Sequence, residues 1–463
     1  MYDYIIIGTG PSGGNIAHNL FKAGANILVL EAGKLMNKKT FPRTEADTSA
    51  RLYWGGGIEF DTDAKMGFLR TRVVGGTSIV NQCLLDRFDD IAFNDWKAES
   101  GVNWFTNEQL AKHYDTVEHA LALHTFTANE MNRNAQLFTQ SCDKIGVKWG
   151  YLRKGQSDCA QERGNDCMAC LGGCHRDSKQ SSYAGYLRDD IAAGLNIQTE
   201  TEVTQIVHNG NTVTLHALQQ SKPVTFQAKN IVLAGGAFGT TKMLLQSGFK
   251  KQLPALGKNF STHPQFMSFG LFNEEIHAYK GYFQTVASKD PNLRQKGYKL
   301  ENVFAPPISA AMLFSRTGAY HQEIMRNYTR MTCIEVAVRD ENAGEIKVDN
   351  KGKLTIDKPF TAQDRRRRDE GRELIANILT NEGAKKVYAS PFSVGLHLMG
   401  GSVMGTDSAK SVVDPEFRVH GYKNMFVADS SIYPNAPGIN PSLTIMALAQ
   451  KLSDQLIGAN HGI

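Results

Sequence analysis

The chain opens with a glycine turn of the kind that binds a pyrophosphate. An apolar run at residues 4–7 predicts a buried strand, and Gly8, Gly10 and Gly13 follow it. Gly8 permits a tight turn, Gly10 lets the backbone approach a pyrophosphate, and Gly13 lets the strand and the next helix pack closely. The free amides at the start of that helix favour a negative charge. The spacing therefore predicts a phosphate-binding turn.

A carboxylate follows where a nucleotide site needs one. The second apolar strand, at residues 26–30, ends in Glu31, which lies 23 residues after Gly8. An acid at this place can bind both hydroxyls of a ribose. A glycine fingerprint alone is weak evidence, because glycine-rich turns are common. Strand, turn, helix and acid in this order predict a dinucleotide site.

A histidine and an asparagine near the other end could act on a hydroxyl group. His397 lies in the stretch His-Leu-Met-Gly-Gly-Ser, and Asn440 precedes a proline. An imidazole titrates near neutral pH and is a natural general base. An amide cannot take a proton there, but it can donate a hydrogen bond and hold an oxygen in line. Taken alone, each residue also has a structural explanation: a core histidine and a loop asparagine that caps backbone groups.

Four of the seven cysteines lie within one short stretch. Cys159, Cys167, Cys170 and Cys174 fall within 16 residues that are rich in glycine and polar side chains. Short loops with such spacings bind iron–sulfur clusters and zinc. Cysteines this close together can also form disulfides or remain as thiols without a metal.

The elements that would hold these residues include both strands and helices. A strand at residues 231–233 runs into another glycine turn at Gly235, and a turn at residues 72–81 leads into a helix start. Residues 92–146 repeat their apolar positions at helical spacing. The other expected elements are strands at 196–199, 203–207, 331–338 and 424–429, a hairpin at 340–356, and a helix at 361–382.

Composition and charge narrow the class of protein. The formal net charge of +5 is small for 463 residues, so it indicates no nucleic-acid partner. No apolar stretch approaches the ~18 residues that a bilayer span needs. The first strand begins at Asp3 and leaves no room for a signal peptide, which predicts a cytoplasmic protein and argues against disulfides. Export together with a signal-bearing partner would also fit a chain without a signal peptide.

Four blocks of the sequence resemble the glucose-methanol-choline (GMC) oxidoreductases, FAD enzymes that oxidise alcohols. They are the glycine turn through Gly33, residues 75–81, residues 231–248, and residues 397–444. The resemblance implies an α/β fold (α+β overall), with a Rossmann-like FAD domain of the glutathione-reductase type and a substrate domain built on an antiparallel sheet flanked by helices. The ranges it implies are 1–90, 191–264 and 391–463 for the FAD domain, 91–190 for a helical and cysteine-rich insertion, and 265–390 for the substrate domain.

The resemblance also implies which residues meet the cofactor. The three N-terminal glycines would contact the pyrophosphate, Glu31 the adenosine ribose, and Val203 the adenine. The flavin end would lie against residues 76–81 and 437–441. The full set of expected FAD contacts is Gly8, Gly10, Pro11, Ser12, Gly13, Glu31, Ala32, Gly76, Thr77, Asn81, Val203, Gly235, Asp429, Asn440 and Pro441.

The implied activity is oxidation of the CH–OH group of an alcohol. His397 would take the hydroxyl proton as the hydride leaves for flavin N5, and Asn440 would orient the oxygen. The expected substrate is a sugar, a long-chain alcohol or a sterol, and the electrons would pass to dioxygen or to an acceptor protein or small subunit. Two further hypotheses keep the fold: light-driven or non-redox chemistry on a lipid, and an electron-transfer subunit without a substrate of its own.

The same family gives one interpretation of the cysteines. Some GMC dehydrogenases carry an iron–sulfur cluster in this region, which relays electrons from the flavin to an external acceptor. The spacing from Cys170 to Cys174 resembles theirs, whereas the spacing upstream departs from it. The resemblance therefore implies a 3Fe–4S or 4Fe–4S cluster with Cys159, Cys167, Cys170 and Cys174 as ligands, while zinc and cysteines without a metal remain open.

Overall fold

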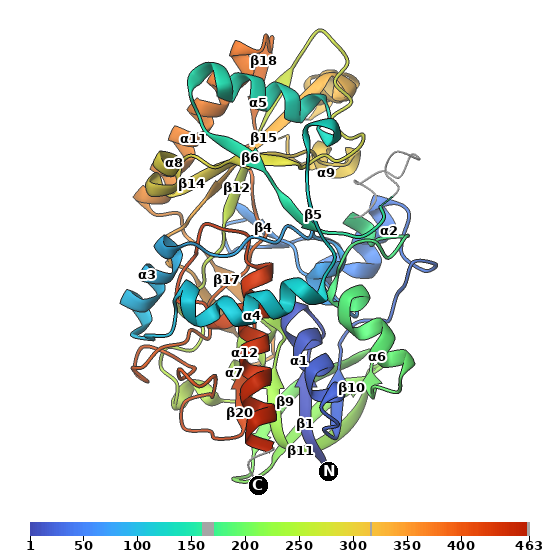
Figure 1. Cartoon of the computed structure of the whole chain (residues 1–463), viewed down its shortest axis with the longest axis vertical. Coiled ribbons are helices and arrows are strands. Elements are labelled where there is room, and N and C mark those ends of the chain that lie inside the picture. The colour runs from blue at the N-terminus through green and yellow to red at the C-terminus, as the bar shows by residue number, and fades with distance from the viewer. Residues whose placement is uncertain (160–170, 315–316, 461–463) are drawn as a thin grey trace.

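The computed structural model describes residues 1–159, 171–314 and 317–460. Two large sheets divide the molecule, one near both chain termini and one at the opposite end (Figure 1). Helices cover both sheets, and a cavity lies where the sheets meet. The expected class, a Rossmann-like α/β unit with a second unit on a mostly antiparallel sheet, is confirmed.

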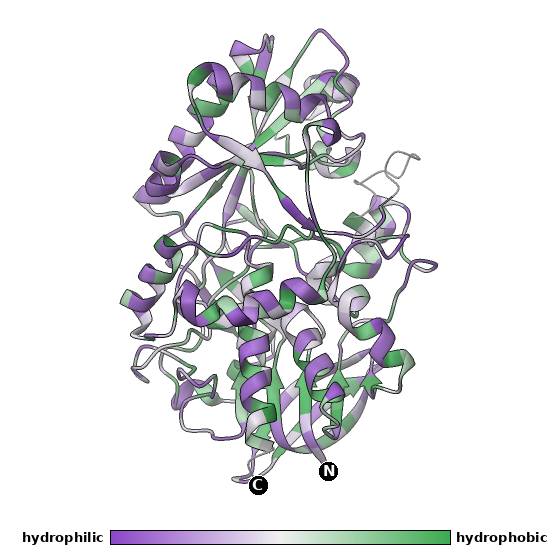
Figure 2. Cartoon of the chain, in the orientation of Figure 1, coloured by the Kyte–Doolittle hydropathy of each residue, from purple (hydrophilic) through white to green (hydrophobic). Residues whose placement is uncertain are grey.

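The first sheet has the strand order β8-β2-β1-β11-β10-β9, with β20 beside β11. Strands β8, β2, β1, β11 and β20 run parallel, while β9 and β10 add an antiparallel edge. Their bounds are β1 Tyr2–Ile7, β2 Ile27–Leu30, β8 Ile197–Gln198, β9 Thr201–His208, β10 Val213–Gln219, β11 Lys222–Leu233 and β20 Met425–Val427. The central parallel strands are apolar where they are covered on both faces, as in β2, whose four residues are all buried, whereas β9 and β10 alternate buried and more exposed residues, and Figure 2 shows both colours in this sheet.

Local sequence explains the first strand–turn–helix unit. Helix α1 (Pro11–Lys22) starts with a proline at its first position, where the missing amide hydrogen costs nothing. It ends before Gly24, which has φ +77°. Helix α12 (Ser442–Asn460) packs against α1, so the two ends of the chain lie side by side (Figure 1).

The second sheet has the order β3-β4-β19-β12-β15-β14-β13-β6, with β18 beside β12. Its strands are β3 Glu59–Phe60, β4 Met66–Phe68, β6 Trp149–Tyr151, β12 Pro264–Leu271, β13 Val286–Ser288, β14 Tyr298–Asn302, β15 Met331–Val338, β18 Lys386–Ala389 and β19 Ser393–Gly395. Helix α11 (Ala362–Asn381) packs on β12, β14 and β15, and α5 (Arg133–Ile145) packs beside it. Side chains of the opposite face line the cavity.

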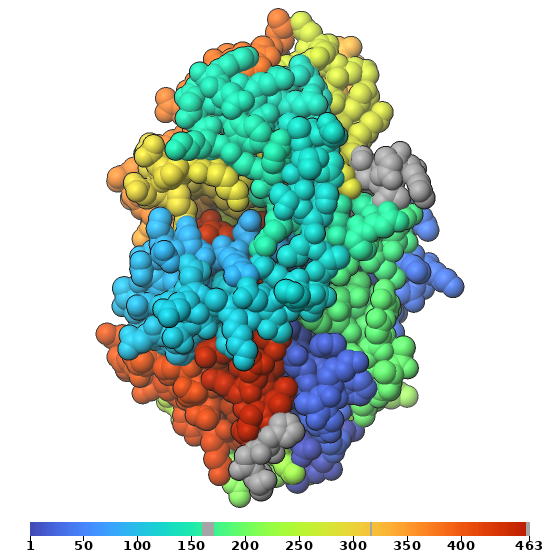
Figure 3. Space-filling model, viewed as in Figure 1, coloured from blue at the N-terminus to red at the C-terminus, as the bar shows by residue number. Residues whose placement is uncertain are grey.

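Other elements connect or flank the sheets. Helices α3 (Asp90–Ser100) and α4 (Asn107–Ala120) lie across one face of the molecule, and Figure 3 shows this light-blue to cyan segment between the upper and lower parts. The remaining helices and strands are α2 Glu45–Leu52, α6 Arg188–Ala192, α7 Gly236–Gln246, α8 Pro291–Lys296, α9 Pro307–Met312, α10 Gly318–Arg326, β5 Leu123–Thr125, β7 Arg153–Gly155, β16 Glu345–Val348 and β17 Leu354–Asp357. No helix in the described ranges is long and apolar enough to cross a bilayer.

The structure differs from the expected elements at two places. The helix start predicted at residues 72–81 is only a 3-10 turn, Gly76–Ile79. Gly75, Gly76 and Cys83 have φ +100°, +56° and +54°, which a right-handed helix does not allow, so no longer helix fits between them. Strands β4 and β19 come from ranges assigned to the FAD domain but pair in the second sheet. The division into domains by residue range stays a proposal.

Candidate active site

A cavity of about 1260 Å³ runs between the two sheets. The β1–α1 turn lines one part of it, and His397 and Asn440 line another. The volume exceeds the roughly 300–1,000 Å³ of a pocket for one small ligand. The cavity therefore has room for a dinucleotide and a substrate together.

Residues far apart in the sequence meet around this cavity. Of the expected cofactor contacts, those that line it are Gly8, Gly10, Pro11, Ser12, Glu31, Ala32, Gly76, Thr77, Asn81, Val203, Gly235, Asp429, Asn440 and Pro441. Gly13 lies behind them, and a Cβ there would stand 2.0 Å from the backbone oxygen of Gly8. In the glycine fingerprint, a glycine at this position lets the helix and the strand pack closely. Which atoms contact a cofactor stays a prediction.

The β1–α1 turn fits a pyrophosphate. No described side chain caps the N-terminus of α1, and the buried hydroxyl of Ser12 has no hydrogen-bond partner in the described chain. Apart from its own chain neighbours, no described heavy atom lies within 4 Å of where a Cβ on Gly10 would stand. Unpaired donors beside open space at a helix N-terminus are what a phosphate requires.

Glu31 joins the segments that form the nucleotide end. Its Oε1 accepts the amide hydrogen of Gly33 at 2.7 Å, and its Oε2 accepts from the amide and hydroxyl of Thr9. The Thr9 hydroxyl oxygen accepts the amide of Gly75 at 3.0 Å. Burial raises the pKa of the Glu31 carboxyl, whereas these hydrogen bonds favour the ionised form. The carboxylate is thus held by the chain at the edge of the cavity.

A buried lysine and serine support the turn at residues 76–81. Lys179 donates from Nζ to the backbone oxygens of Ile79 and Asn81, the second at 2.9 Å. Ser182 donates to the backbone oxygen of Thr9 at 2.9 Å. These contacts tie the expected flavin end to the glycine turn. The sequence had given no reason to single out Lys179 or Ser182.

Asp429 lines the cavity but is itself fully engaged by the chain. Its Oδ2 accepts from the amide of Gly236 at 2.8 Å and from the hydroxyl of Thr240, and its Oδ1 accepts from the amide of Ser431. Burial raises the pKa of this carboxyl. The side chain fixes the start of α7 against the loop after β20.

His397 forms a pair with a second histidine that sequence reasoning missed. Nδ1 of His263 lies 2.9 Å from Nδ1 of His397, and the amide of Gly438 donates to Nε2 of His263 at 2.8 Å. Desolvation lowers the pKa of His263 well below its usual value, and with the charge of Lys299 it lowers the pKa of His397 to about 4. Both rings are therefore neutral at pH 7.

The hydrogen-bond chain determines where the neutral rings carry hydrogen. Because the Gly438 amide can only donate, Nε2 of His263 accepts and its Nδ1 carries the hydrogen. That hydrogen points at Nδ1 of His397, so His397 carries its own hydrogen on Nε2. In this arrangement the His397 ring is a hydrogen-bond donor at Nε2.

Asn440 contacts one of three clustered ionisable residues that the sequence did not single out. Its Oδ1 accepts a hydrogen bond from Lys299, whose Nζ also lies 2.6 Å from Oε1 of Glu301. Glu301 and Glu335 both line the cavity and are both buried. A glutamate inside the apolar run of β15 was the signal that could have revealed this cluster.

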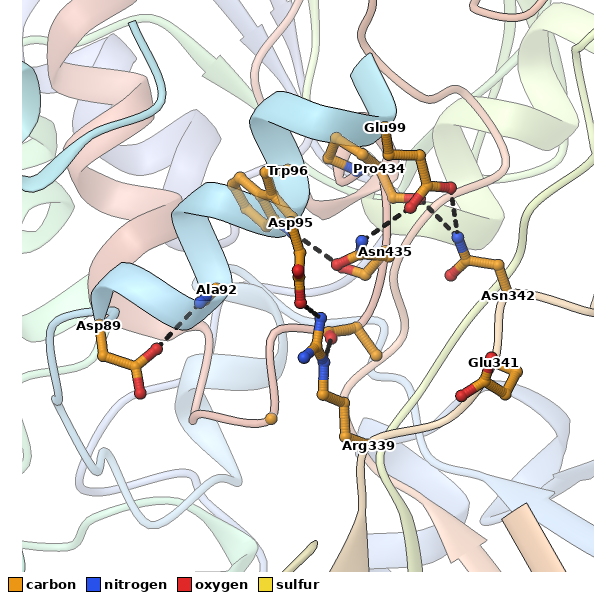
Figure 4. Close-up of polar contacts among 12 residues, drawn as sticks. Asp89, Ala92, Asp95, Trp96, Glu99, Arg339, Glu341, Asn342, Pro434 and Asn435 are labelled. Atoms are coloured by element: carbon orange, nitrogen blue, oxygen red, sulfur yellow. Dashed lines mark hydrogen bonds and ion pairs between the residues drawn. The ribbon is translucent and has the colours of Figure 1, made fainter. Parts of the chain in front are cut away.

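Helix α3 holds the loop that precedes the cavity asparagine (Figure 4). Trp96 donates from Nε1 to the backbone oxygen of Asn435 at 3.1 Å, and Glu99 accepts from Nδ2 of the same residue at 2.7 Å. From the end of β15, Arg339 donates to the backbone oxygen of Ala436 at 2.7 Å. The loop is therefore fixed from two sides.

The metal assignment of the cysteines is not settled by the described residues. Cys167 and Cys170 lie outside them, and Cys159 and Cys174 are buried. Within the described ranges, no group of three or more His, Cys, Asp or Glu side chains is arranged to hold a metal ion. A cluster or zinc site stays a prediction.

Comparison with known proteins gives the family of this architecture. Two models described as GMC oxidoreductase match residues 49–265 and 340–449. An uncharacterised GMC-type oxidoreductase of Mycobacterium tuberculosis is 26% identical over 100% of this chain and 76% of its own length. Long-chain-alcohol oxidase FAO4B of Arabidopsis thaliana is 24% identical over 98% of this chain and 67% of its own.

A solved structure agrees in fold. Pyridoxine 4-oxidase from Mesorbium loti superposes with a TM-score of 0.78, covering 98% of this chain and 99% of its own, at 16% sequence identity. This likeness supports the two-sheet fold.

Filling the space at Gly10 should separate cofactor binding from folding. Gly10 has φ −64°, which alanine adopts without strain, so Gly10→Ala is expected to fold. Its methyl group would occupy the space left for the pyrophosphate, so the flavin content of the purified protein should fall severalfold. Gly458→Ala in α12, where a Cβ also meets open space, is the control. Equal flavin content in both variants would contradict the placement of the pyrophosphate.

Proposed function

The chain belongs to the GMC oxidoreductase family, whose members are FAD enzymes, and on that premise we propose that it oxidises the CH–OH group of an alcohol. The observation that carries the proposal is that His397 and Asn440 line the same cavity as the β1–α1 turn, whose unpaired donors fit a pyrophosphate. Bound FAD would supply the two-electron acceptor for the hydride of the carbinol carbon. The product is an aldehyde or ketone, and the electrons then pass from the flavin to dioxygen or to an acceptor protein.

The two side chains have complementary roles at the hydroxyl. Asn440 presents an amide whose oxygen is engaged by Lys299, so its Nδ2 can donate to the substrate oxygen. His397 takes the hydroxyl proton. Holding the oxygen between a donor and a base places it in line for transfer and avoids reorganisation during the reaction.

Proton acceptance by His397 requires a concerted change in the histidine pair. Nε2 must be without hydrogen, so Nδ1 of His397 would donate to Nδ1 of His263, which would then carry its hydrogen on Nε2. That arrangement turns the N–H groups of Gly438 and of Nε2 of His263 toward each other and leaves both donors without an acceptor, at a cost of about 1–3 kcal/mol for each. The exchange balances when Nε2 of His397 releases its proton, the proton on Nδ1 of His263 moves to Nδ1 of His397, and Nε2 of His263 takes up a proton. Both rings are then neutral before and after the exchange.

The wall beyond the two catalytic side chains favours an apolar alcohol. Side chains of this part of the cavity are mostly hydrophobic: Met267, Phe283, Val303, Phe304, Leu313, Val394 and Leu396. Burying a chain against them gains about 0.8 kcal/mol per methylene. Together with the likeness to a long-chain-alcohol oxidase, this supports a long-chain primary alcohol over a sugar.

Replacing the base should stop flavin reduction without loss of the cofactor. In His397→Gln the side chain keeps hydrogen-bonding capacity but cannot take a proton, and general base catalysis contributes about 10²–10⁴-fold. Anaerobic stopped-flow measurement with a good alcohol should therefore show reduction slowed at least ~100-fold. His216→Gln, an exposed histidine on β10, is the control. If His397→Gln reduced its flavin at the wild-type rate, His397 would not be the general base.

The pH profile should reflect the lowered pKa of this base. Because the pKa of His397 is lowered to about 4, the ring stays neutral and able to accept a proton at every pH above that value. We expect kcat/KM to stay level from neutral pH downward and to fall only as the pH drops through about 4. A half-loss near the ordinary imidazole pKa of ~6.5 would contradict the desolvated position of the ring.

Chain length should decide substrate preference. At about 0.8 kcal/mol per methylene, kcat/KM for primary alcohols should rise roughly fourfold with each added carbon until the cavity is filled. The measurement compares a series of linear alcohols with glucose under the same conditions. A kcat/KM that is highest with glucose, or that does not change with the chain length of the alcohol, would argue against an apolar substrate.

A further inference from the structure

The second sheet carries a row of three ionisable side chains, Lys299, Glu301 and Glu335, and the two glutamates line the cavity. Glu301 on β14 lies directly opposite Glu335 on β15 in the antiparallel register. Lys299 is two residues before Glu301, so both side chains project from the same face of β14. Like charges opposite each other destabilise a sheet, and each of the two glutamates is only 1% exposed. Such a pair persists only if something neutralises it.

One proton and one ammonium supply that neutralisation. Burial and the neighbouring Glu301, which lies directly opposite in the sheet, raise the pKa of Glu335 well above its ordinary value, so Glu335 is the carboxyl of the pair that holds the proton. Burial alone would raise the pKa of Glu301, but the adjacent Lys299 lowers it overall, so Glu301 is ionised. Gln284 donates a further hydrogen bond to Oε2 of Glu301 at 2.9 Å. The charges of Lys299 and Glu301 cancel and Glu335 is neutral, so the three side chains together carry no net charge.

The free side of the ammonium faces Asn440. Nζ of Lys299 has only donors, so the amide atom that meets it must be Oδ1 and not Nδ2. Within the described chain, Nδ2 of Asn440 has no hydrogen-bond partner, and the side chain lines the cavity. The contact therefore determines which way the amide is turned.

We infer that Lys299 is a positioning residue that fixes the amide of Asn440, with its oxygen toward the second sheet and its NH₂ toward the substrate oxygen. Glu301 holds the ammonium in place, and the proton on Glu335 allows Glu301 to stay ionised beside it. The inference rests on the proposed function for the role of Asn440, but the contact between residues 299 and 440 can be tested without any substrate.

A thermal double-mutant cycle tests the contact. Residue 440 is only 7% exposed, and Asn440→Asp places a carboxylate there, next to the ammonium of Lys299. Because the new charge is paired, the holoenzyme should lose little thermal stability. In the Lys299→Met background the same carboxylate has no cation, and the midpoint of unfolding should drop by several degrees more. Equal drops in the two backgrounds would overturn the inference, whatever the enzyme acts on.

A kinetic cycle then tests the role. Lys299→Met and Asn440→Ala should each slow anaerobic flavin reduction by an alcohol about 10- to 100-fold with FAD retained. The double variant should be no slower than the slower single variant, because Lys299 acts through Asn440. Effects that multiply would overturn the inference. Lys347→Met on β16, which removes an exposed lysine two residues from its partner Glu345, is the matched control.

The two cycles separate the oxidation from the positioning role. If no alcohol reduces the wild-type flavin, the proposed oxidation fails, and the thermal cycle still decides the contact. If alcohols reduce the wild-type flavin but the kinetic effects of Lys299→Met and Asn440→Ala multiply, the oxidation stands and the positioning role of Lys299 fails.

Discussion

Exclusion of water from the inner end of the cavity is the constraint on which the site depends. His263, Glu301 and Glu335 are each only 1% exposed, so each needs a partner from the chain for its hydrogen or its charge. The backbone amide of Gly438 donates a hydrogen bond to His263, and Lys299 pairs with Glu301. The two glutamates share one proton. Desolvation also keeps the pKa of His397 low, which leaves a neutral ring where a base is needed.

Rigid elements hold the loops that line the cavity beside the proposed catalytic residues. Helix α3 and the end of β15 fix the loop before Asn440, and Lys179 fixes the turn at residues 76–81. Neither set of contacts touches the expected position of the hydroxyl. They matter because small displacements of a catalytic group are costly, and loops depend on a scaffold for their precision.

Local sequence patterns were enough for much of this arrangement. The β1–α1 unit, strand β15 and helix α11 were predicted because apolar periodicity, glycine turns and proline act over a few residues. His397 and Asn440 were identified through the motifs around them. His263 and the Lys299–Glu301–Glu335 row were not. The pairing of β12 with β19 brings His263 to His397, and the register of β14 with β15 brings Glu301 to Glu335; both join residues far apart in the chain. The pairing of β4 with β19 was missed for the same reason.

The most direct test of the central claim is an experimental structure of the reduced holoenzyme with a long-chain alcohol bound. The account predicts the hydroxyl oxygen within hydrogen-bond distance of both Nε2 of His397 and Nδ2 of Asn440, with the carbinol carbon facing the reactive nitrogen of the flavin. An alcohol bound with its oxygen away from both side chains, or a flavin ring outside the cavity between the two sheets, would contradict it.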